Sequence, residues 1–86
     1  MIGDGKVPIL GITYTIAFEE LDDENGYISP RRQHIGIRRG MNDELVQQTV
    51  LHEIIHGVLD QLGYHELYED ERLVQGLAIG LHQAFY

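Results

Sequence analysis

Cysteine is absent from this chain of 86 residues, which excludes disulfide bonds, thiolate metal ligands and thiol nucleophiles together. Basic residues are also scarce, because six Lys and Arg residues face fourteen Asp and Glu residues and the formal net charge is −8. Nucleic-acid binding depends mainly on contacts from Lys and Arg to phosphate groups, so we expect no direct nucleic-acid partner. We interpret the one arginine cluster, Arg31, Arg32, Arg38 and Arg39, as a solvated strand rim.

Long apolar segments are missing as well. No apolar run approaches the roughly 20 residues that a membrane-spanning helix needs, and we expect no membrane partner. The start, Met1-Ile2-Gly3-Asp4, has neither the basic residues nor the apolar stretch of a signal peptide. These observations predict a cytoplasmic protein, with residues 1–86 forming one small domain.

One motif, at positions 51–57, indicates a possible metal site. Positions 51–57 read Leu-His-Glu-Ile-Ile-His-Gly, an H-E-x-x-H pattern inside a long apolar-periodic segment. At about 100° per residue, His52 and His56 lie some 40° apart on one helix face, so both imidazoles can reach one metal ion. Glu53 projects close enough to act on a water molecule at that ion without being a ligand. The pattern is typical of zinc hydrolases, although two histidines that only pack in a helix would share the spacing.

The segment before this motif has the features of a small sheet. Residues 7–18 contain β-branched and aromatic residues at period two, and we expect a single strand there, with a bulge or bend at Gly11. Asn25-Gly26 predicts a turn, followed by short strands at 27–29 and 34–38. The expected arrangement is a three-stranded antiparallel sheet.

Two helices are predicted after the sheet. Asn42 is a plausible N-cap, and Gly63 ends a helix that begins at about Asp43. Apolar residues occupy two sides of this helix, which indicates that it lies between two neighbouring layers. A last helix from about residue 69 to 85 is expected to bury Val74, Leu77, Ala78, Leu81 and Phe85. The predicted fold class is α+β, in the order β-β-β-α-α.

A catalytic zinc ion usually has three protein ligands, and the residues alone leave the third one open. The metzincin pattern fails, because Leu59 and Leu62 stand where it requires Gly and His. His65 lies in the expected linker and could bend back towards the metal. Glu71 lies at the start of the second helix, at the edge of the face that packs on the first. The remaining alternative is that no third protein ligand exists.

The helical motifs resemble those of the ImmA/IrrE-type zinc metallopeptidases, which are gluzincin-like enzymes, and in particular their small stand-alone members from phages and bacteria. The resemblance rests on H-E-I-I-H followed by Glu-Arg-Leu-Val-Gln-Gly-Leu-Ala at 71–78. It implies a zincin-like domain in which His52, His56 and Glu71 bind Zn²⁺ and Glu53 is the catalytic base. The chain departs from longer relatives at Val74-Gln75, where Ala-Asn is usual, and we expect no helix-turn-helix domain within residues 1–86.

The expected function is therefore a zinc-dependent metallo-endopeptidase that hydrolyses a protein or peptide substrate. Tyr64, His65 and Tyr68 are equal candidates for the donor that stabilises the oxyanion. The strand at 34–38 could pair with an extended substrate. The alternative is a non-proteolytic, zinc-stabilised protein-interaction module, and Glu53 favours the enzyme because a purely structural site does not need it.

Overall fold

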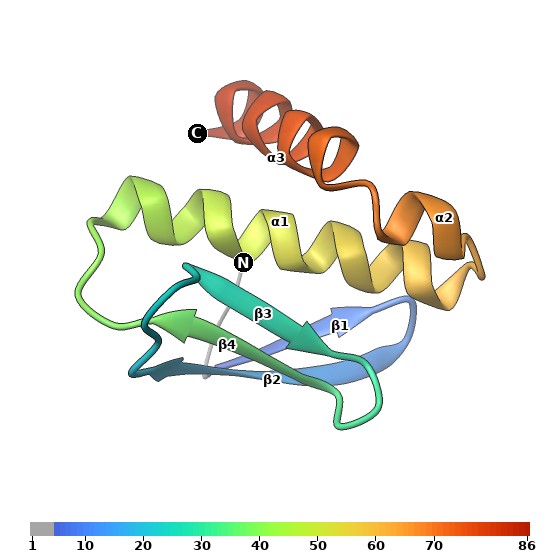
Figure 1. The fold of residues 1–86 in the computed structure, drawn as a ribbon, viewed down its shortest axis with the longest axis horizontal. Coiled ribbons are helices and arrows are strands. Elements are labelled where there is room, and N and C mark those ends of the chain that lie inside the picture. The colour runs from blue at the N-terminus through green and yellow to red at the C-terminus, as the bar shows by residue number, and fades with distance from the viewer. Residues whose placement is uncertain (1–4) are drawn as a thin grey trace.

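Four strands and three helices make up the part of the chain that the computed structural model describes, residues 5–86 (Figure 1). The interpretation of Met1-Ile2-Gly3-Asp4 lies outside these residues. The α+β class is confirmed. No helix within residues 5–86 is long and apolar enough to cross a lipid bilayer. In chain order the elements are β1 (Lys6–Ile9), β2 (Ile12–Glu19), β3 (Gly26–Ser29), β4 (His34–Arg38), α1 (Asp43–Gln61), α2 (His65–Tyr68) and α3 (Glu71–Phe85).

The sheet has four strands in the order β1-β2-β4-β3. β1 pairs with β2 and β3 pairs with β4 in antiparallel fashion, whereas β2 and β4 are parallel. The predicted three-stranded antiparallel sheet was therefore wrong. In place of one strand over residues 7–18 there are two, because the chain reverses at Leu10 (φ 49°) and Gly11 (φ 86°). Positive φ at both central residues is typical of a tight hairpin turn, and Leu rarely adopts it.

The core lies between one face of the sheet and α1. Alternate residues of the strands point towards the helix, and Tyr14, Ile35 and Ile37 are almost completely buried there. Gly57 lets the helix approach closely, since a Cβ atom at this position would lie 2.8 Å from Cδ1 of Ile9. The turn of α1 that follows the H-E-x-x-H motif is thus fixed against the sheet.

The ends of α1 are as predicted. The Asn42 side chain accepts a hydrogen bond of 2.8 Å from the Leu45 backbone N–H, and Gly63 adopts a positive φ of 82° just after the helix. The prediction that α1 lies between two layers is also confirmed, because the sheet covers one side and α3 another (Figure 1).

The C-terminal part differs from the prediction in two ways. The expected linker contains a short helix, α2, and α3 begins at Glu71 with Asp70 as its cap. Val74 and Ala78 are buried as expected, but Leu77, Leu81 and Phe85 are 44%, 40% and 77% exposed. The last three were wrongly predicted to be buried, because α3 lies mainly against α1 and one helix covers only a narrow stripe of another.

Candidate metal centre

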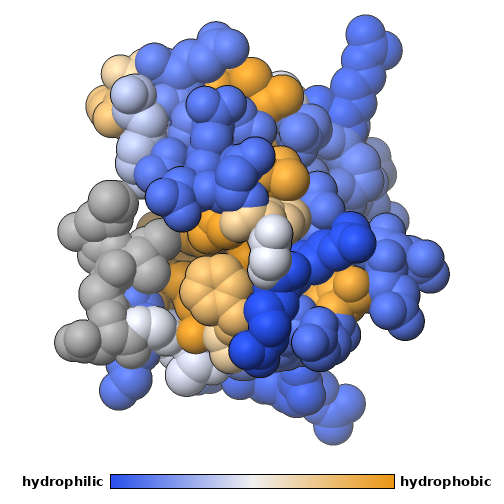
Figure 2. Space-filling view, turned by 90° about the vertical axis from the view of Figure 1, so that its left-hand side faces the viewer, coloured by the Kyte–Doolittle hydropathy of each residue, from blue (hydrophilic) through white to orange (hydrophobic). Residues whose placement is uncertain are grey.

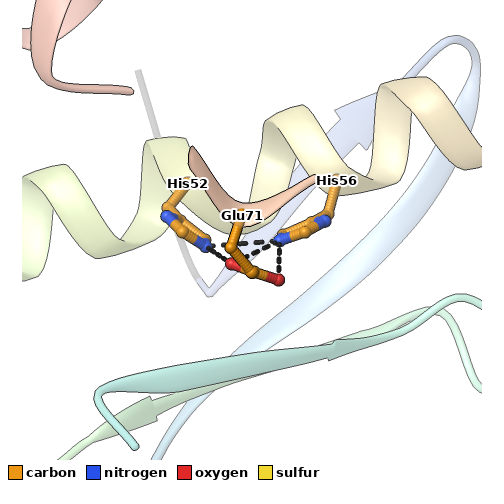
Figure 3. Close-up of side chains that lie close together, drawn as sticks. All are labelled: His52, His56 and Glu71. Carbon is orange, nitrogen blue, oxygen red and sulfur yellow. Dashed lines mark hydrogen bonds and ion pairs between the residues drawn. The ribbon is translucent and has the colours of Figure 1, made fainter. Parts of the chain in front are cut away.

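Three side chains from two helices converge in the space between α1 and α3 (Figure 3). Nε2 of His52 lies 2.9 Å from Oε1 of Glu71, and Nε2 of His56 lies 3.1 Å from Oε2 of the same carboxylate. The two Nε2 atoms are 3.2 Å apart. The structure thus brings together the two histidines of the motif and Glu71, and not His65.

These separations match the needs of a metal ion. Bonds of about 2.0–2.1 Å in a tetrahedron place neighbouring ligand atoms roughly 3.3 Å apart, close to the distances that separate the two Nε2 atoms and the carboxylate oxygens. Two imidazoles and one carboxylate are also the donor set of many hydrolytic zinc centres. His52, His56 and Glu71 can therefore hold a metal ion with little rearrangement.

A further residue orients His52. Its Nδ1 lies 2.7 Å from Oε1 of Gln75, and an amide oxygen can only accept, so Nδ1 carries the proton. In a neutral imidazole this leaves Nε2 with its lone pair directed at the metal position. This role of Gln75 was not predicted from the sequence. Its position four residues after Glu71, on the same face of α3, was the available signal.

His56 is held by packing. Its ring packs against the Tyr68 ring in a T-shaped arrangement with centroids 5.0 Å apart, and its side chain is only 7% exposed. Nδ1 of His56 is buried and has no hydrogen-bond partner within the described residues. The ring is therefore oriented by its aromatic neighbour, and not through a polar contact at Nδ1.

Glu53 lies beside the three ligand side chains and is buried. Burial is the main cause that raises the pKa of this carboxyl to about 7; the charge of His52 opposes the rise, and Glu71 and Glu24 add to it. A carboxyl with a pKa near 7 can take up and release a proton near neutral pH, as a general base requires.

Two cavities, of about 260 and 340 Å³, adjoin this centre and share His52, Glu53 and Glu71 among their lining residues. Both are also lined by Gly26, at the start of β3. A Cβ atom on Gly26 would lie 2.7 Å from Cγ2 of Thr49, so the absence of a side chain lets β3 approach α1 closely. Together the cavities form a cleft between α1 and the edge strand β3.

The candidate oxyanion donors are not equivalent in space. Tyr68 lines the larger cavity together with Glu53 and the three ligand residues, and burial raises the pKa of its hydroxyl. Tyr64 and His65 line a separate cavity that contains none of these residues. Of the three candidates, Tyr68 is the one beside the centre.

No family model, no curated protein and no solved structure matches this chain.

Proposed function

We propose that this protein is a zinc-dependent metallo-endopeptidase of the ImmA/IrrE type, with a zincin-like domain. The observation that carries the proposal is the convergence of His52, His56 and Glu71 next to the buried carboxyl of Glu53. A site that only stabilises the fold needs the three ligands and has no use for a fourth, protonatable carboxyl. The cytoplasmic location expected from the sequence remains a prediction.

His52, His56 and Glu71 would hold Zn²⁺, which when bound supplies Lewis-acid activation of a water molecule and of the substrate carbonyl. Glu53 accepts a proton from the attacking water and then delivers it to the leaving amine. In the metal-free protein, burial raises the pKa of the Glu53 carboxyl to about 7, so this group can both take up and release a proton near neutral pH. Gln75 keeps the His52 ring in the tautomer and orientation that ligation needs.

Tyr68 is the residue best placed to stabilise the oxyanion that forms at the substrate carbonyl. Its side chain lines the cavity beside Glu53, and it is held against the His56 ring. A hydroxyl that stays protonated at neutral pH can donate a hydrogen bond to developing negative charge, and burial keeps the pKa of Tyr68 raised.

The strand expected to pair with substrate requires a correction. β4 is interior, with β2 on one side and β3 on the other, so its backbone has no free edge. β3 is one of the two edge strands, and it is the one that borders the cleft. We infer that an extended substrate adds to β3 and that the cavities receive its side chains. The cleft is lined by Glu24, Glu53 and Glu71 and by no Lys or Arg, which disfavours acidic side chains near the cleaved bond.

The decisive experiment compares the wild type with the Glu53→Gln variant for zinc content and for cleavage of an unfolded protein substrate. Zinc should remain near one ion per chain in both proteins, and cleavage should fall at least a hundredfold in the variant. Glu66→Gln, an exposed change on α2, is the matched control and should cleave normally. Zinc binding without cleavage by the wild type would favour the alternative, a zinc-stabilised interaction module.

A further inference from the structure

A further cavity, lined almost wholly by apolar side chains, lies on another side of the molecule. It has a volume of about 330 Å³ and is bordered by β2, β4, α1 and the end of α3. None of its lining residues is charged, although the chain carries a formal charge of −8. Figure 2 looks onto this end of the molecule and shows hydrophobic residues gathered between helices and sheet. The apolar lining residues are Ile16, Phe18, Ile37, Val46, Val50 and Leu51.

α3 extends this apolar surface. Its buried residues Val74 and Ala78 face α1, and the metal-site residue Gln75 lies on one side of them. On the other side, by helical geometry, lie Leu77 and Leu81, which are 44% and 40% exposed. Leu77 and Leu81 therefore face away from the metal centre.

The surface is large for a chain of this size. Phe18, Phe85 and Tyr86 are 51%, 77% and 54% exposed, and the two leucines of α3 add to them. At about 200 Å² for a fully exposed large side chain, these five contribute roughly 500 Å². Two copies in contact would bury at most about 1,000 Å² from these side chains, which is near the lower limit of specific interfaces.

We propose that this surface, formed by Phe18, the apolar cavity and the exposed side of α3, is the interface of a two-fold symmetric dimer. One patch on each copy meets the same patch on the other, so the contact closes after two subunits. The area near the lower limit implies a reversible dimer of moderate affinity. The metal-site cleft lies on the other side of α3 and stays open, so dimer formation is independent of the proposed peptidase activity.

The stability of this dimer should depend on salt concentration in a direction that distinguishes apolar contacts from ion pairs. Two chains that each carry a charge of −8 repel one another, while the apolar cavity within the proposed interface is lined by no charged side chain. Salt screens the repulsion, with a Debye length of about 10 Å at 0.1 M, and leaves apolar burial intact. Raising the salt concentration should therefore strengthen the dimer, whereas an association built on ion pairs would weaken.

Sedimentation equilibrium of the full chain over a concentration series up to about 500 μM tests the proposal. The wild type should shift from monomer to dimer, and should shift earlier in about 0.5 M than in about 0.05 M NaCl. Leu81→Glu should raise the dimer dissociation constant at least tenfold. Leu67→Glu is the matched control, because Leu67 is similarly exposed at 39% but lies on α2, away from the surface.

Phe18→Glu is the second test, because it changes the other border of the same surface on a strand. Circular dichroism and zinc content establish that each variant is folded. A wild type that remains monomeric throughout the concentration series overturns the proposal. So does a dimer that tolerates both Leu81→Glu and Phe18→Glu, and so does one that weakens in high salt. Loss of peptidase activity bears on none of these outcomes.

Discussion

Gln75 accepts a hydrogen bond of 2.7 Å from Nδ1 of His52, which joins α3 to α1 directly behind the metal position. Glu71, one turn earlier on α3, contacts Nε2 of the same ring at 2.9 Å. A single helix turn thus supplies both a metal ligand and the residue that orients another ligand. The packing of α3 on α1 and the metal centre therefore depend on each other.

The first prediction follows from this contact. Gln75→Leu should lower zinc affinity about tenfold or more, because the His52 ring loses the acceptor that fixes its orientation. Competition with a chromogenic chelator measures the affinity. Gln83→Leu makes the same chemical change at an exposed position of the same helix and should leave the affinity unchanged. Equal zinc affinity in the two variants would show that Gln75 does not position His52.

The second prediction concerns the third ligand. Glu71→Gln keeps the size and helix propensity of the side chain but removes its charge, so zinc affinity should fall at least tenfold while helicity persists. Glu69→Gln changes an exposed acid just before α3 and should have almost no effect. His65→Ala should lower zinc affinity only slightly, because His65 lies outside the group formed by His52, His56 and Glu71. The reverse result for Glu71 and His65 would reassign the ligand.

The third prediction concerns Tyr68. Tyr68→Phe removes one hydroxyl and keeps the ring that packs on His56, so zinc binding should persist. If the hydroxyl stabilises the oxyanion, kcat should fall about a hundredfold with little change in KM. Tyr64→Phe, outside the cleft, is the control and should behave as the wild type. Unchanged kcat in Tyr68→Phe would leave the tyrosine with only a packing role.

Much of α1 and of the centre could be predicted because the signals are local. The Asn42 cap, the Gly63 stop and the spacing of His52 and His56 each depend on a few neighbouring residues. The Glu71 side chain lies in the space between the two helices, as expected from its position at the edge of the α3 face that packs on α1, while its role as a ligand stays a prediction.

The sheet could not be predicted in the same way. The turn at Leu10-Gly11 lacks the usual Asn-Gly or Asp-Gly signal, and the parallel pairing of β2 with β4 joins residues far apart in the chain. The exposure of Leu77 and Leu81 was missed for a different reason. An apolar stripe indicates that a helix face can be buried, but it does not say what covers the face.

The last prediction uses the pKa of Glu53, which is raised from 4.5 to about 7 mainly by burial. In the metal-free protein the folded state holds this proton more tightly than the unfolded state. The free energy of unfolding should therefore fall as pH rises from about 4.5 to about 7. Above that range the Glu53 carboxyl should cause no further decrease.

Glu53→Gln removes this titration, so its stability relative to the wild type should increase with pH across the same window. The difference should reach on the order of 3 kcal/mol at most, at 1.36 kcal/mol per pKa unit. Urea unfolding of both proteins in EDTA, at several pH values between about 4.5 and 8, measures it. Glu66→Gln is the control for the loss of one surface carboxylate, because Glu66 is exposed on α2. A difference for Glu53→Gln that stays constant across the pH window would mean that the Glu53 carboxyl is solvated and its pKa normal. Glu53, the proposed proton acceptor, would then lack the burial that sets its pKa near neutral pH.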